Sequence, residues 1–307
     1  MQKFRKIYGV LPVLHTPFSH VDEIDHDSLE REISWLTGLG VHGITTGMVS
    51  EILKLSPTER MALHEFVIER VGSSGLTTVL SAGAESTKQA IVYAKHAQDL
   101  GADAIMVNPP LTSSLGDDDL RRYFCTILDS TDIPMVVQDA SGYIGRPLSL
   151  ELQVKLFRDF EHRIYFKPEA LPIGPRLSRF LEATEGRAKV LEGSGGLALI
   201  DTHDRGVVGT MPGSDTAWAL VALWKALEAG DQDWAEAISG PLANLSALEH
   251  SLEAYLAVEK YLMVKQGIFT SENRREPIGY RLDDKTRERI DKLFASLHRS
   301  VFREVGK

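Results

Sequence analysis

The chain has one cysteine, Cys125, among its 307 residues, so no internal disulfide can form. No stretch approaches the roughly 18 apolar residues that a membrane-spanning helix needs, and residues 1–6 contain no apolar signal-peptide core. Long runs of lysine and arginine are also missing, and the formal net charge is -9, which argues against a nucleic-acid partner. These absences predict a cytoplasmic protein that binds neither membranes nor nucleic acid.

Two cofactor signatures are absent as well. The histidines show no His-x-x-x-His spacing with a third acidic ligand, so we predict no metal site. No Gly-x-Gly-x-x-Gly follows the first strand-like segment, which disfavours a dinucleotide site and an open doubly wound sheet. We therefore expect the protein to work without a cofactor.

What the sequence does contain is a regular alternation of short apolar runs with amphipathic helical patterns. Eight such repeats are typical of parallel βαβ units that close into a TIM (β/α)8 barrel, an α/β fold of about this length. The predicted strands are 9–14, 43–46, 77–82, 104–107, 134–138, 164–167, 189–191 and 207–210. The predicted helices between them are 28–39, 57–71, 87–100, 117–128, 149–159, 174–185 and 197–204.

Strand patterns stop after Ser214, and the rest of the chain is helical in pattern. We expect helices over 217–228, 233–266 and 284–302. This predicts two parts: a barrel over 1–214 and a C-terminal helical extension over 215–307 that packs on it.

Lys167 is the most informative residue, because it ends the sixth predicted strand directly before Pro168. Active sites of such barrels lie at the carboxyl ends of the strands. Desolvation there favours a neutral, nucleophilic amine, which is the form that makes a Schiff base with a ketone. Glu169 lies two residues further and would share the same face, where it could stabilise the iminium or move a proton. A buried ion pair without chemistry explains the same two residues equally well.

The other strand ends add polar groups. Asp139 is a candidate acid–base group, although an aspartate that fixes a loop is the alternative. His15 could contact a substrate, although a lone histidine is more often a structural group. Gln138, Gly193 and Thr210 complete the expected substrate-binding set on these strands.

Several motifs, taken in order, resemble the dihydrodipicolinate synthase / N-acetylneuraminate lyase family of class I aldolases and dehydratases. They lie at 9–18, 43–60, 101–110 and 206–209, and the likeness extends over almost the whole chain. The resemblance implies that Lys167 forms a Schiff base with pyruvate or another 2-oxo acid. It also implies a lyase that assembles as a homo-oligomer, either a dimer or a tetramer.

The chain departs from the family pattern, which indicates a divergent member. Gly47–Glu51 reads Gly-Met-Val-Ser-Glu where the family typically has Gly-Thr-Thr-Gly-Glu, so two hydroxyl groups are missing. Backbone amides of Met48 and Val49 could still hold a carboxylate. Glu51 either serves the substrate or binds backbone amides near the helix start. Gln138 replaces the family's catalytic tyrosine, and Tyr143 is a substitute only if it leaves its loop position.

Two functions therefore remain open at this point. One is a lyase that uses Lys167 for aldol cleavage or condensation, or for dehydration. The other is a non-catalytic barrel that binds a 2-oxo acid and has lost the tyrosine/threonine proton relay. Retention of Lys167 with Glu169 beside it favours the enzyme.

Overall fold

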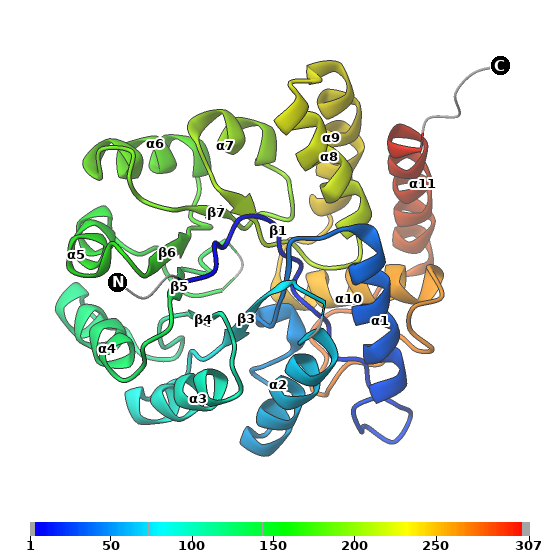
Figure 1. Cartoon of the computed structure of the whole chain (residues 1–307). Coiled ribbons are helices and arrows are strands. Elements are labelled where there is room, and N and C mark those ends of the chain that lie inside the picture. The colour runs from blue at the N-terminus through cyan, green and yellow to red at the C-terminus, as the bar shows by residue number, and fades with distance from the viewer. Residues whose placement is uncertain (1–3, 73, 143, 303–307) are drawn as a thin grey trace.

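The computed structural model describes residues 4–72, 74–142 and 144–302 (Figure 1). Parallel strands form the centre of the molecule, and helices surround them. The strands are β1 (Gly9–Val10), β2 (Gly43–Thr45), β3 (Thr77–Ser81), β4 (Ala104–Val107), β5 (Met135–Gln138), β6 (Ile164–Lys167), β7 (Leu191–Glu192) and β8 (Gly209–Thr210). The helices between them are α1 (His26–Leu39), α2 (Pro57–Val71), α3 (Thr87–Asp99), α4 (Asp117–Asp129), α5 (Leu150–Phe160), α6 (Ile173–Ala183) and α7 (Leu199–Arg205).

The strands close into a barrel in chain order. β2 to β6 pair in sequence, and β8 lies between β7 and β1. Two parallel bridges, Val13 with Thr45 and Phe166 with Val190, join these two sets into one ring. The predicted TIM barrel is thereby confirmed.

Alternation along the strands separates two apolar layers. Leu11, Val79, Met106, Val136 and Tyr165 belong to one cluster that fills the barrel, whereas their strand neighbours pack outward against the helices. Side chains two residues apart on a strand share a face. Tyr165 is inside the barrel, so Lys167 also points inward, at the carboxyl end of β6.

The predicted start of α2 is confirmed in detail. The Ser56 side chain accepts a hydrogen bond from the Glu59 amide at 3.2 Å, and the Glu59 carboxylate accepts one from the Ser56 amide at 2.8 Å. This reciprocal capping box satisfies two amides at the helix start, and Pro57 follows as the first helical residue.

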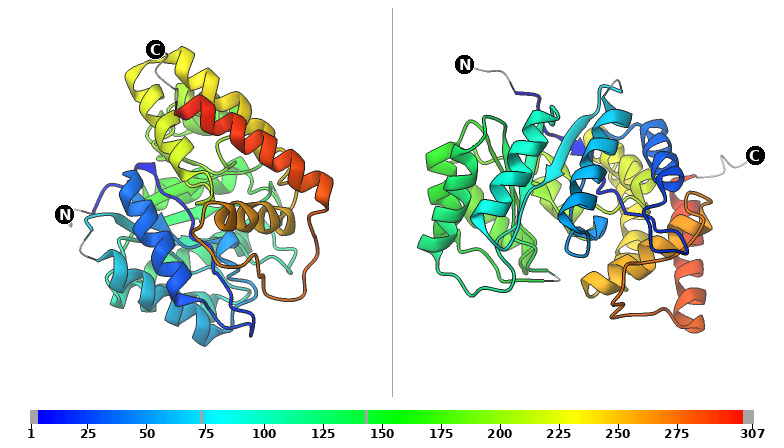
Figure 2. Two further views of the ribbon diagram at one scale, coloured as in Figure 1. Left: turned by 90° about the vertical axis from the view of Figure 1, so that its right-hand side faces the viewer. Right: turned by 90° about the horizontal axis from the view of Figure 1, so that it is seen from below.

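As far as residue 302, where the description ends, the C-terminal region contains four helices: α8 (Ala217–Ala229), α9 (Gln232–Ser246), α10 (Leu252–Lys265) and α11 (Asp284–Val301). α8 contacts α1 and β1, which places it on the ring of helices after the eighth strand. α9 and α11 pack against each other and against α8, beside the barrel (Figures 1 and 2). The division between residues 214 and 215 stays a prediction. None of the described helices is long and apolar enough to cross a bilayer.

The single helix predicted over 233–266 is wrong. The chain leaves the helix after Ser246 and starts again at Leu252, where the Ser251 side chain accepts a hydrogen bond from the Ala254 amide. A serine N-cap marks the start of a new helix. The apolar spacing continues across residues 247–251, so periodicity alone did not reveal this start. The break brings α10 against the short 3-10 helix η1 (Met48–Ser50) at the strand ends.

Barrel closure depends on a close backbone approach between β1 and β8. A Cβ atom on Gly209 would lie 2.3 Å from the Gly9 carbonyl oxygen, which cannot move without breaking the pairing. We predict that Gly209→Ala lowers the free energy of unfolding by about 2–4 kcal/mol in urea denaturation. Gly38→Ala is the matched control, because Gly38 lies in α1 with nothing within 4 Å. It should be neutral or stabilising by about 1 kcal/mol, and equal losses in both variants would contradict this account.

Candidate active site

Lys167 and Glu169 form a buried ion pair at the carboxyl end of β6. Their side chains are 5% and 3% exposed, and Lys167 Nζ donates to Glu169 Oε1 at 2.6 Å. Gln138 Nε2, from the end of the neighbouring strand β5, donates to the same oxygen at 3.1 Å. The second carboxylate oxygen, Glu169 Oε2, is buried without a hydrogen-bond partner. Burial raises the pKa of Glu169, and the charge of Asp139 adds to this rise, while Lys167 opposes it.

Asp139 lies behind this pair. Its Oδ1 accepts hydrogen bonds from the Glu169 amide at 2.9 Å and from the Ser141 amide at 3.1 Å. Burial raises the pKa of Asp139, although these hydrogen bonds limit the shift. The aspartate therefore fixes the segment that presents Glu169, and its charge acts on that carboxyl group.

Lys167 faces a narrow cavity of about 30 Å³ at the mouth of the barrel. Gly193 forms part of its wall, and a Cβ atom there would lie 2.8 Å from Glu169 Oε1 and 3.0 Å from Lys167 Cε. The glycine is thus required by the close approach of the chain to the ion pair. The cavity is lined by Val13, Met48, Val49, Met106, Gln138, Lys167, Gly193, Gly195, Met211, Pro212, Gly213, Tyr255 and Glu259.

The loop after β2 contributes Met48 and Val49 to this cavity, but Glu51 turns away from it. Glu51 has a positive φ of 53° and pairs with Lys260 of α10, and both side chains are fully buried. Lys260 Nζ also donates to the Thr16 carbonyl oxygen at 2.7 Å and to the Asn273 carbonyl oxygen at 2.8 Å. Burial lowers the pKa of Lys260, and the Glu51 carboxylate opposes that shift. Glu51 therefore holds α10 over the strand ends.

His15 is fully buried beside the cavity rather than on its wall. Its Nδ1 lies 3.1 Å from Glu32 Oε1, and its Nε2 lies 2.9 Å from Glu259 Oε2. Burial alone would lower the pKa of His15, but Glu259 and Glu32 outweigh it and raise the pKa to about 10. The imidazole is thus a buried cation that links α1 to α10. Thr210 is a comparable support, because its hydroxyl donates to Glu192 at 2.7 Å.

Sequence reasoning missed the contribution of α10 and its N-terminal flank. Tyr255 and Glu259 line the cavity, and Glu249 lies in the turn before the helix. Burial raises the pKa of Glu249 well above its usual range, and burial together with Glu259 raises the pKa of Asp215 to about 7. Glu259 and Lys260 are charged residues within a mostly apolar helix, and this pattern was the available signal that α10 contributes to the site. Tyr143 lies outside the described residues.

Comparison with known proteins identifies the family. The model of the dihydrodipicolinate synthetase family matches residues 6–296. The chain belongs to this family. Family membership agrees with the sequence resemblance, and identities of 21–36% to relatives and solved structures fit a divergent member.

Individual relatives are similar to this chain over most of its length. The 4-hydroxy-tetrahydrodipicolinate synthase of Methanosarcina mazei is 32% identical over 65% of this chain and 68% of its own length. An uncharacterized DapA-like lyase of Pyrococcus horikoshii is 29% identical over 84% of this chain and 90% of its own. The crystal structure of dihydrodipicolinate synthase from Rhodopseudomonas palustris superposes with a TM-score of 0.86 at 26% identity, covering 95% of this chain and 98% of that chain.

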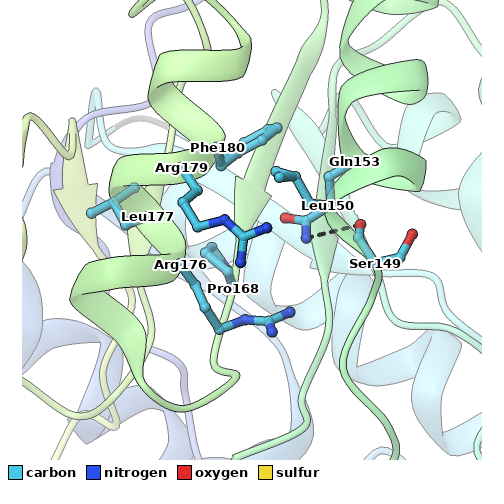
Figure 3. A pocket seen from close by; sticks show the side chains of 8 residues that line it. All are labelled: Ser149, Leu150, Gln153, Pro168, Arg176, Leu177, Arg179 and Phe180. Atoms are coloured by element: carbon cyan, nitrogen blue, oxygen red, sulfur yellow. Dashed lines mark hydrogen bonds between the residues drawn. The ribbon is translucent and has the colours of Figure 1, made fainter.

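A second, larger cavity of about 210 Å³ lies between α5 and α6 (Figure 3). Pro168, between Lys167 and Glu169, lines this cavity, so the two sides of one segment face different spaces. Arg176 projects from α6 here, and its positive charge limits the rise in the pKa of Asp139. The charge of Arg176 therefore reaches the aspartate that holds the Glu169 backbone.

The His15 network predicts a specific pH dependence of stability. The folded-state pKa of about 10 lies above the usual histidine pKa of 6.5, so the stabilisation is complete below pH 6.5 and is lost as pH rises toward 10. In that window one extra proton is bound in the folded state, so stability should fall by up to about 1.4 kcal/mol per pH unit. Above about pH 7 the carboxyl of Asp215 contributes no further change.

Urea denaturation between about pH 7.5 and about pH 9.5 measures this slope. In the double variant His15→Gln/Glu32→Gln, one carboxylate is neutralised together with its cation, and the new amide at position 15 can still donate to Glu259. The slope should then be reduced. An identical slope in the parent protein and the variant would show that His15 is not the buried cation.

Proposed function

We propose that this protein is a lyase that forms a Schiff base through Lys167 with pyruvate or another 2-oxo acid. The reaction class is aldol cleavage or condensation, or dehydration of a sugar-derived 2-oxo acid. The observation that carries the proposal is the position of Lys167: a desolvated amine that points into a cavity at the catalytic end of the barrel. The other expected site residues, Asp139 and Glu169 as acid–base groups and Met48, Val49 and Gln138 as substrate contacts, belong to this proposal.

The geometry supplies a reason for each group. The neutral amine of Lys167 adds to the ketone carbon, the hydroxyl group of the carbinolamine receives one proton and leaves as water, and a protonated imine forms. Glu169, 2.6 Å from Nζ, then faces the positive iminium and can accept a proton from the adjacent carbon to give the enamine. Its raised pKa and its unpartnered Oε2 suit a group that must bind and release a proton. Backbone amides of Met48 and Val49 are proposed to hold the substrate carboxylate.

The remaining substrate-site residues are proposed to act through their partners. His15 supports Glu259, Thr210 supports Glu192, and Glu51 anchors Lys260. By the family resemblance, we also propose that the chain works as a homo-oligomer, a dimer or a tetramer, in the cytoplasm.

Proton exchange at pyruvate tests the function without knowledge of the full substrate. The imine makes the methyl protons of pyruvate acidic, so the parent protein should catalyse their replacement by deuterium in heavy water, followed by NMR. Lys167→Arg retains a cation for Glu169 but cannot form an imine. Exchange in this variant should fall to the rate without protein. Persistent exchange in Lys167→Arg, or no exchange above background in the parent protein, would contradict the proposal.

Asp139 should tune this reaction through Glu169. Asparagine retains the acceptor oxygen that holds the Glu169 amide, but it removes the negative charge that raises the pKa of Glu169. We therefore predict that Asp139→Asn leaves imine formation intact, lowers turnover, and moves the acidic limb of the pH–rate profile to lower pH. The profile of methyl exchange against pH measures it. An acidic limb at the same pH as in the parent protein would remove Asp139 from this role.

A further inference from the structure

We propose that Tyr255 of α10 is the proton donor for imine formation at Lys167. The phenol would protonate the hydroxyl group that leaves the carbinolamine. This inference rests on the proposed function, and it assigns a catalytic role to a residue outside the eight strands.

Position is the first argument. Tyr255 lines the same cavity as Lys167, and that cavity is only about 30 Å³ in volume. A group attached to Nζ must therefore contact the residues that surround it. Among the lining residues, the titratable ones other than Lys167 are Tyr255 and Glu259. Glu259 already accepts a hydrogen bond from the His15 imidazole at 2.9 Å, which ties its charge to the buried cation.

Chemistry is the second argument. Collapse of the carbinolamine breaks the C–O bond, and hydroxide is a poor leaving group unless it receives a proton. Transfer of the phenol proton to that oxygen releases water and leaves a positive iminium on Lys167 and a phenolate on Tyr255. Glu169 is needed as a carboxylate at this point, because its negative charge balances the iminium and it then accepts a proton from the adjacent carbon. A different group must therefore donate the proton.

The surroundings of Tyr255 favour its protonated form, so the resting phenol carries the proton that this step needs but is a weaker acid than a free tyrosine. Burial raises its pKa, and the charges of Glu249, Glu259, Glu169 and Glu192 raise it further. A phenolate in this place is therefore strongly basic and regains a proton readily. Among the acidic neighbours Glu249 acts most strongly on Tyr255, and the pKa of Glu249 is itself raised by burial. Its carboxyl group is the proposed source from which the phenolate regains its proton.

The test is the rate at which the imine appears. Protein is mixed with pyruvate, quenched with borohydride at successive times, and weighed intact by mass spectrometry. Tyr255→Phe removes the hydroxyl and keeps the ring, so the adduct should form about 10²-fold more slowly but reach the same final extent. Tyr261→Phe is the matched control, because Tyr261 is on the same helix and its hydroxyl donates to Asp291 at 2.8 Å. Its rate should equal that of the parent protein.

A second variant separates proton donation from packing. A fluorinated tyrosine incorporated at position 255 keeps the hydroxyl and makes it more acidic, so the rate of adduct formation should change, whereas a packing role predicts no change. An unchanged rate of adduct formation in Tyr255→Phe, or a slowed rate in Tyr143→Phe instead, would overturn the role of Tyr255 and leave the proposed function intact. Absence of any adduct in the parent protein would overturn the proposed function together with it.

Discussion

The hydrogen-bonded ion pair of Lys167 and Glu169 is the interaction around which the mouth of the barrel is built. Removal of an ammonium and a carboxylate from water costs several kcal/mol each, so each group needs its partner and further hydrogen bonds. Gln138 supplies one such bond, Asp139 holds the glutamate backbone, and Gly193 leaves space for both side chains. One oxygen on each of Glu169 and Asp139 is buried without a hydrogen-bond partner, which is the kind of local cost that proteins retain at functional sites.

The same constraint explains the role of α10. Glu259 and Lys260 of this helix are buried, and each pairs with an opposite charge on the barrel. Glu259 pairs with His15, and Lys260 pairs with Glu51. Buried pairs of this kind fix a geometry more than they add stability, because either partner alone would be strongly unfavourable. The helix is thereby held at one position over the strand ends, and Tyr255 is presented to the cavity as a consequence.

The sequence predicted the parts of the site that depend on local pattern. Strand alternation and a two-residue spacing place Lys167 and Glu169 together, and pairing of β5 with β6 brings Gln138 beside them. It could not predict Glu259 and Lys260, whose partners lie 244 and 209 residues away along the chain. The break before α10 was missed because the apolar spacing of residues 233–266 continues through it, while the Ser251 cap gives only a local signal. His15 and Glu51 end strands or loops as expected, yet their orientation is decided by charges on distant elements. Thr210 is held by Glu192 on the neighbouring strand.

Intact-mass analysis of the parent protein after incubation with pyruvate and borohydride, followed by peptide mapping, tests the central claim most directly. Larger 2-oxo acids in parallel incubations would rank the substrates. The account predicts a mass gain equal to the reduced adduct, located on Lys167. A folded protein that gains no mass with any of these acids, or that carries the adduct on a different lysine, would contradict it and leave Lys167 and Glu169 as a structural ion pair.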